Sequence, residues 1–167
     1  MDVAAHYRQL VELGRDEFLA AAAPAVLVRY RSDVGPEFSG LTTLTLDEST
    51  VPIAKEPPEG HMVVEVYPLA KKPGASFPDR ITIGRTANND IAINDHSVSR
   101  LHAYLRVESG RWVVADAGSK NGSFLRGKPL EPRKEQAVAS RMIVRIGEVD
   151  MTFFGASDLF EMLRGMP

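Results

Sequence analysis

Hydrophobic and polar residues show two different periodicities along this chain, a helical one at the start and a β-type one from residue 61 onward. In the first stretch, apolar side chains recur at Val3, Tyr7, Leu10, Val11, Phe18 and Leu19. This spacing predicts a helix over residues 2–23, with one apolar face. Pro24 ends it, because proline lacks an N–H donor and restricts the residue before it.

Residues 24–60 carry a weaker pattern. Apolar runs at 26–28 and 41–46 predict short strands, and glycines and prolines separate them. Residues 50–60 contain several prolines and read as a linker. We therefore treat residues 1–60 as an N-terminal extension of helix and short strands. Two alternatives stay open: a small α+β unit, or an extension of the domain that follows.

Residues 61–155 change character, because short β-prone runs alternate with glycine and asparagine turns. The runs lie at 62–67, 80–83, 91–93, 102–107, 112–115, 142–146 and 149–154. Two tight turns, at 108–110 and at 147–148, predict hairpins. Many short strands at this spacing predict a β-sandwich or barrel over 61–155. Residues 156–167 form a C-terminal tail with a short helix over 156–165.

Composition narrows the class of protein. The 167 residues are 44% apolar and 25% charged, enough for one domain with a real core. The net charge of −2 provides no strong positive field for non-specific nucleic-acid binding. There are no cysteines, which excludes disulfides and thiolate zinc sites and fits a reducing, cytoplasmic setting. The best apolar run, residues 18–28, is shorter than the roughly 20 residues of a membrane span.

Cationic and polar residues gather in the predicted loops. Arg85 follows Gly84 at a strand end, and Ser99 and Arg100 are adjacent on a second loop. Residues 119–122 offer a hydroxyl, an ammonium, an amide and a flexible backbone on a third. Loops at one end of a rigid sandwich commonly carry binding groups. If the three loops meet at that end, their side chains would form a local cationic pocket.

Such a pocket suits a phosphate group on a peptide. A phosphorylated side chain carries about −1.5 to −2 charge at pH 7 and three strong acceptor oxygens. Arginine pairs with two oxygens at once, and a serine hydroxyl or loop N–H groups can occupy the rest. The amide of Asn121 presents a donor and an acceptor together. It can therefore pair with the main chain of an extended peptide.

The order and spacing of these pieces resemble a forkhead-associated domain. The resemblance rests on Gly-Arg at 84–85, Asn-Asp-Ile-x-Ile at 89–93, Ser-Arg-x-His at 99–102 and Ser-x-Asn-Gly-Ser at 119–123. It covers residues 61–155. It implies an eleven-stranded β-sandwich that recognises phosphothreonine through its loops.

The family's roles carry over onto matching positions. Arg85 would contact the phosphate, and Ser99 would donate its hydroxyl to a phosphate oxygen. Arg100 would add charge or a backbone contact. Asn121 would hold the main chain of the ligand. Three further residues would shape the site without touching the ligand: Gly84, His102 and Gly122.

Lys120 departs from the family pattern, which often has threonine or serine before the Asn-Gly pair. The lysine adds positive charge near the phosphate but removes a short hydroxyl, for which Ser119 would compensate. The expected phosphopeptide-binding set is therefore Arg85, Ser99, Arg100, Ser119, Lys120 and Asn121.

The resulting prediction is a phosphothreonine-dependent adaptor in a Ser/Thr kinase pathway, with a phosphorylated protein or peptide as partner. We expect no catalysis, cofactor, metal, nucleic acid or membrane. The alternative is a phospho-independent scaffold or self-association module, in which the N-terminal helix joins chains into a homo-oligomer. The ligand could also be intramolecular, since threonines occur at 42, 43, 45 and 50.

Two further interpretations need weighing. Ser99, His102 and Asp116 are the residue types of a hydrolytic triad, which is recognised by geometry rather than composition. No nucleophile-elbow sequence surrounds Ser99, so a hydrolase is disfavoured. The basic pairs at 71–72 and 133–134 are expected to be solvated loops.

Overall fold

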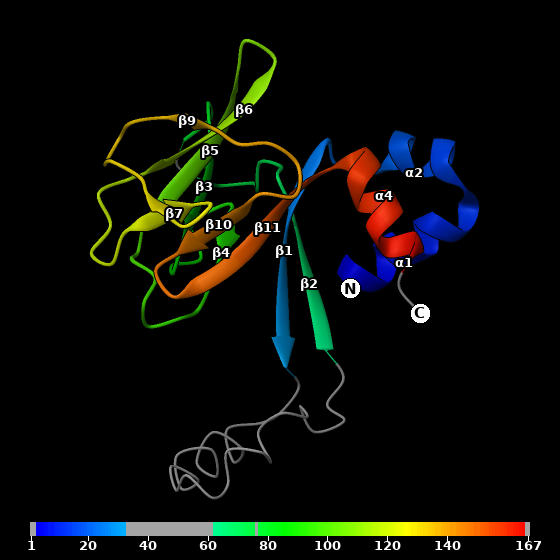
Figure 1. Cartoon of the computed structure of the whole chain (residues 1–167), viewed down its shortest axis with the longest axis horizontal. Coiled ribbons are helices and arrows are strands. Elements are labelled where there is room, and N and C mark those ends of the chain that lie inside the picture. The colour runs from blue at the N-terminus through cyan, green and yellow to red at the C-terminus, as the bar shows by residue number, and fades with distance from the viewer. Residues whose placement is uncertain (1–2, 33–61, 76, 166–167) are drawn as a thin grey trace, which may run out of the picture. The chain divides into compact units, whose positions relative to one another are not determined.

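A computed structural model describes residues 3–32, 62–75 and 77–165. Within these ranges, two β-sheets carry the fold (Figure 1). Four predictions fall outside them: the linker at 50–60, the strand at 41–46, the intramolecular ligand threonines and the start of the long helix at residue 2. By compactness the chain divides into residues 30–65 and the remainder. Of the first unit, only the ends of two strands are described, where Arg31 lies 2.9 Å from Glu65.

The first sheet has six strands and the second has five. In spatial order the first is β2 (Met62–Pro68), β1 (Ala25–Ser32), β11 (Val149–Gly155), β10 (Ile143–Ile146), β7 (Ser123–Leu125) and β8 (Lys128–Pro129). The second is β4 (Ile91–Ala92), β3 (Ile81–Gly84), β5 (Ala103–Glu108), β6 (Arg111–Asp116) and β9 (Gln136–Ala137). These eleven strands of the described chain confirm the predicted mainly β class.

The core contains side chains from both sheets. Ile83 and Leu105 come from the five-stranded sheet, and Leu27, Ile146 and Met151 come from the six-stranded one, all at most 1% exposed. Such side chains alternate along each strand, because successive residues of a β-strand point to opposite faces. The apolar core fixes the two sheets, and the strands then position the loops at their ends.

β1 belongs to the sandwich, although we placed its residues in the N-terminal extension. It pairs antiparallel with β11, with Ala25 opposite Gly155 and Val28 opposite Thr152. Residues 25–28 are all fully buried, as in a strand covered on both faces. Part of the stretch before residue 61 is therefore continuous with the six-stranded sheet, as the second alternative anticipated.

Both predicted hairpins are confirmed. β5 and β6 are joined by Ser109 and Gly110, with Glu108 opposite Arg111. The two loop residues have φ values of 51° and 76°, the paired positive angles of a type I′ turn, which matches strand twist. Gly147, at φ 61°, is the first residue of the turn in the second hairpin, which joins β10 and β11.

The N-terminal helix is divided, which corrects the prediction of one continuous helix. α1 (Val3–Leu13) and α2 (Arg15–Ala21) are separated by Gly14. Its φ of 109° is outside the helical region and is readily adopted only by glycine. The chain therefore turns between the helices while the apolar spacing continues.

The predicted C-terminal helix is confirmed as α4 (Ala156–Arg164), and it packs with α1 and α2 (Figure 1). Phe18 of α2 is fully buried between Tyr7 and Phe160, with ring centroids 5.9 and 5.3 Å away. Both pairs are edge-to-face, a favoured aromatic geometry. We refer to α1, α2 and α4 as the helix cluster. No helix in the described ranges has the length and apolar character to cross a bilayer.

Candidate functional site

The loop after β3 presents Arg85 and is held directly to the loop before β5. The backbone N–H of Arg85 donates to the Ser99 carbonyl at 2.9 Å. The Arg85 side chain is exposed and has no ion-pair partner among the described residues. The two loops that carry the predicted phosphate ligands therefore meet, with the guanidinium free to contact a ligand.

Gly84 makes this close approach possible. A Cβ atom at residue 84 would lie 2.0 Å from the Arg100 carbonyl oxygen and 2.6 Å from Nδ2 of Asn89. No real Cβ contact is that short, so only glycine fits without moving a loop. The predicted site-shaping role of Gly84 thus has a steric basis, although its effect on binding stays a prediction.

Asn89 is a further structural residue that the sequence reasoning did not assign. Its buried side-chain amide donates to the Thr86 carbonyl at 2.9 Å and to the Arg100 carbonyl at 2.7 Å. It therefore ties the β3–β4 loop to the residue beside Ser99. The signal was present in the Asn-Asp-Ile run, but the sequence alone does not show which carbonyls the amide reaches.

The carboxylate of Asp90 anchors the same loop from the other side. It accepts bonds from the Thr82 backbone N–H at 2.9 Å and from Lys71 Nζ at 2.7 Å. Burial opposes its ionisation, but these donors together hold the pKa of Asp90 below its ordinary value. Lys71 and Lys72 lie in an exposed loop, as predicted, but Lys71 also pairs with a fully covered carboxylate.

His102 braces the Ser99 loop through both ring nitrogens. Nδ1 accepts the backbone N–H of Ser99 at 3.0 Å, so Nε2 carries the proton and donates to the Gly122 carbonyl at 2.8 Å. The side chain is fully buried, and this burial lowers the pKa of His102, although the Gly122 carbonyl and Asp116 act the other way. The neutral ring thus links two of the site loops.

Asp116 organises the third loop. Its carboxylate accepts bonds from the hydroxyls of Ser119 and Ser123 at 2.5 and 2.6 Å, and from the backbone N–H groups of Gly118 and Ser119 at 2.9 and 3.0 Å. Burial opposes ionisation, but these four donors hold the pKa of Asp116 below its ordinary value. Buried carboxylates need such partners to remain charged.

The Ser119 hydroxyl is committed to this loop, because it also accepts the Gly122 backbone N–H at 2.9 Å. A contact between Ser119 and phosphate stays a prediction, and it would require the hydroxyl to leave Asp116. Gly122 itself, at φ 83°, turns the chain in a conformation that favours glycine. The structure thus places both residues inside the frame of the loop.

Ser99, Lys120 and Asn121 stand where the loops meet. Ser99 Oγ accepts the Lys120 backbone N–H at 3.1 Å, and its own proton has no acceptor among the described residues. Asn121 donates from Nδ2 to the Ser97 carbonyl at 2.9 Å, which leaves its carbonyl oxygen available. Direct hydrogen bonds therefore connect all three loops that carry the predicted site.

Three cations face solvent around this junction: Arg85, Arg100 and Lys120. None forms an ion pair with an acid in the ranges that the structure describes. The polar groups beneath them are satisfied, since no buried side-chain nitrogen or oxygen of the described residues lacks a partner. The site is a rigid frame with unpaired positive charge at its surface, which suits a di-anionic ligand.

Ser99, His102 and Asp116 do not form a hydrolytic relay. His102 bonds the backbone N–H of Ser99, not its hydroxyl, and the Asp116 carboxylate bonds serines and loop N–H groups. A relay requires the base to contact the nucleophile and the acid to orient the base. In the described part of the chain, no group of three His, Asp or Glu side chains is placed to hold a metal.

The described chain is thus a two-sheet β-sandwich whose loops meet at one polar, cationic junction. The family model for the FHA domain matches residues 81–147, which include every predicted site residue. The chain belongs to the forkhead-associated family, whose domains are phosphothreonine-binding modules. The family resemblance inferred from the sequence is thus confirmed.

Individual relatives differ in how much of them the chain covers. It is 36% identical over 130 residues to an oxoglutarate dehydrogenase inhibitor of Corynebacterium diphtheriae, covering 74% of this chain and 84% of that one. An FHA domain-containing protein of Arabidopsis thaliana is 35% identical over 81 residues, covering 48% of this chain but only 20% of that protein. A crystal structure of the MEK1 FHA domain is 17% identical with a TM-score of 0.49, over 80% of this chain and 90% of that one.

Proposed function

We propose that this protein binds phosphothreonine peptides as an adaptor in a Ser/Thr kinase pathway. Arg85 and Ser99 contact the phosphate, Asn121 holds the peptide main chain, and Arg100 and Lys120 add charge. The observation that carries the proposal is the set of three unpaired cations on hydrogen-bonded loops. The phosphorylated ligand forms charge-assisted bonds there that its unmodified form cannot.

The proposal describes binding rather than catalysis. The Corynebacterium relative is named an inhibitor, which supports a regulatory role for a chain covering most of its length. In the candidate site, His102 is neutral and both of its nitrogens bond backbone groups. It therefore has no free nitrogen to move a proton on a substrate. The frame serves to present charge at fixed positions.

Arg85→Ala tests the phosphate contact. Loss of one partner of a hydrogen-bonded charge pair costs roughly 2–5 kcal/mol of binding free energy, about thirtyfold or more in affinity. We expect fluorescence anisotropy with an oriented phosphothreonine peptide library to show this loss, while the circular dichroism spectrum is unchanged. Arg111→Ala is the matched control, because Arg111 is an exposed arginine outside the site loops.

Near-native affinity in Arg85→Ala would overturn the assignment of the phosphate site. Equal binding of phosphorylated and unphosphorylated libraries would instead support the phospho-independent scaffold. One observation favours that second candidate: Leu13 and Leu19 of the helix cluster are 66% and 38% exposed. Sedimentation of the wild type beside Leu13→Ser and Leu19→Ser then shows whether these side chains join copies of the chain.

A further inference from the structure

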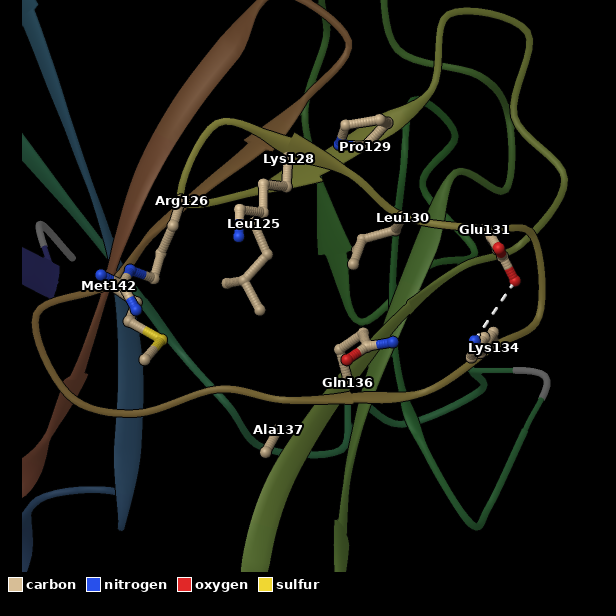
Figure 2. Close-up of a pocket in the computed structure, with 10 residues that line it drawn as sticks. All are labelled: Leu125, Arg126, Lys128, Pro129, Leu130, Glu131, Lys134, Gln136, Ala137 and Met142. Atoms are coloured by element: carbon tan, nitrogen blue, oxygen red, sulfur yellow. Dashed lines mark ion pairs between the residues drawn. The ribbon is translucent and has the colours of Figure 1, made fainter.

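A pocket of about 430 Å³ lies outside the candidate phosphate site (Figure 2). Leu125, Leu130 and Met142 form its apolar part, and each also packs against the sandwich core. Arg126, Lys128 and Lys134 add cations. We call these six residues the distal pocket. Figure 2 shows the ion pair of Lys134 with Glu131 at one end, and Arg126 and Met142 at the other.

The distal pocket is connected to the phosphate site by two further hollows. The first, of about 580 Å³, shares Arg126 and Met142 with the distal pocket. The second, of about 470 Å³, shares Gly127 and Arg145 with the first and is lined by Asn121. A series of neighbouring hollows, which we call the path, therefore lies between the residue proposed to hold the peptide main chain and the distal pocket.

The charge along this path is predominantly positive. Five cationic and three acidic side chains line the three hollows. Arg126 and Lys128 are exposed and have no acidic partner in the described ranges, while Lys134 lies 3.5 Å from Glu131. The complementary ligand therefore carries negative charge near Arg126 and Lys128, next to an apolar group that covers Leu125 and Leu130.

We propose that the distal pocket binds an acidic residue and a neighbouring bulky apolar residue of the same phosphorylated partner. This rests on the proposed function and extends it to a second contact. From Asn121 to Arg126 the chain itself spans at most about 17 Å when extended. An extended peptide covers that span with about five residues. The acidic residue therefore lies at most about five positions from the phosphothreonine along the direct line.

Two phosphothreonine libraries, short and long, test this contact. The short one has about two randomised residues on each side, which extend only about 7 Å beyond the phosphothreonine, and the long one has about twelve. We expect the wild type to select an acidic residue beside a large apolar residue at the outer positions of the long library. Lys128→Glu should weaken selected long peptides about three- to tenfold and favour a basic residue there.

The short library should bind Lys128→Glu as it binds the wild type. Arg111→Glu is the control, since it reverses one exposed charge away from the path and should leave both libraries unaffected. No outer preference, or an equal loss for both libraries in Lys128→Glu, would overturn the distal contact alone. Failure of both libraries to bind the wild type would instead overturn the proposed function.

Discussion

The loops of the candidate phosphate site and the helix cluster are stabilised by different kinds of interaction. In the loops, Gly84, Asn89, Asp90, His102 and Asp116 fix the backbone through short directed bonds and one close approach. We call these five residues the loop frame. In the helix cluster, aromatic rings pack edge-to-face. The Ala23 backbone N–H donates to the Tyr7 hydroxyl at 3.3 Å, and Arg15 donates to the Ser157 hydroxyl at 2.9 Å.

This difference means that one region fixes the positions of the site residues and the other contributes to the stability of the fold. Hydrogen bonds depend steeply on geometry, so the loop frame holds Arg85 and Ser99 at fixed points. Apolar burial is non-directional and scales with area, so the helix cluster contributes stability but sets no atom of the site. A substitution in the cluster should therefore reduce folding free energy and leave affinity intact. A substitution in the loop frame should reduce phosphopeptide affinity strongly, even where it reduces the free energy of unfolding only slightly.

The largest expected effect on stability comes from Phe18→Ala. Removing a fully buried phenylalanine typically costs about 3–5 kcal/mol. We expect urea unfolding followed by circular dichroism to show this loss. Phosphopeptide affinity, measured where the protein stays folded, should change less than about twofold, because the ring packs against Tyr7 and Phe160 of the helix cluster.

Leu19→Ala is the matched control on the same helix. Leu19 is 38% exposed, and substitutions at such positions usually change stability by less than about 0.5 kcal/mol. A large affinity loss in folded Phe18→Ala protein would show that the helix cluster positions the site after all. The separation drawn between the two regions would then fail.

Gly84→Ala tests the loop frame from the opposite side. The added methyl group would lie 2.0 Å from the Arg100 carbonyl oxygen, so a loop must move. Overpacking of this kind typically costs about 1–3 kcal/mol of stability. We expect an affinity loss of about tenfold or more, because the loops meet at this point. Calorimetric titration with a phosphothreonine peptide measures it.

Gly155→Ala provides the control for the same chemical change. Its new Cβ would find its nearest atom, Ser140 Oγ, at 3.9 Å, an ordinary contact. Neither glycine has a positive φ, so backbone strain does not distinguish them. Equal affinities for Gly84→Ala and the wild type would contradict the steric role of Gly84.

The same contrast explains what the sequence could predict. The longer strands and both hairpins were predictable, because alternation and turn residues are local signals. Strands β7, β8 and β9 were not, since two or three residues carry no periodicity. Gly14 was visible as an isolated glycine in a helical pattern, but the apolar spacing continued past it and hid the break.

Within the candidate site, the sequence pointed to the residues proposed to face the ligand more readily than to those that hold them in place. Arg85, Ser99 and Asn121 belong to a recognisable pattern of residue types and spacing. The ion pair of Lys71 with Asp90 joins residues nineteen positions apart and arises only from tertiary folding. The Ser119 hydroxyl likewise needed the structure, because only its neighbours show that it is already bonded.

The smallest expected effect is a pH dependence that belongs to the loop frame. The folded protein lowers the pKa of His102 below its ordinary 6.5, so the unfolded chain binds the proton more readily. His102 therefore favours folding fully above pH 6.5, and this advantage is lost as pH falls below that value. The lowered pKa values of Asp90 and Asp116 act in a separate window, below about pH 4, where their ordinary value of 3.8 lies.

His102→Asn isolates this dependence, because asparagine does not titrate while every other ionisable group remains. One proton changes stability by at most about 1.4 kcal/mol per pH unit. We expect urea unfolding of the wild type to show falling stability from pH 7 to pH 5, and the variant to show a flatter profile from a lower starting value. Stability without peptide is the right readout, because the ligand phosphate itself titrates near pH 6. Parallel profiles would mean that the buried ring accepts its proton without disturbing Ser99, and the loop frame would then not depend on the neutral form of His102.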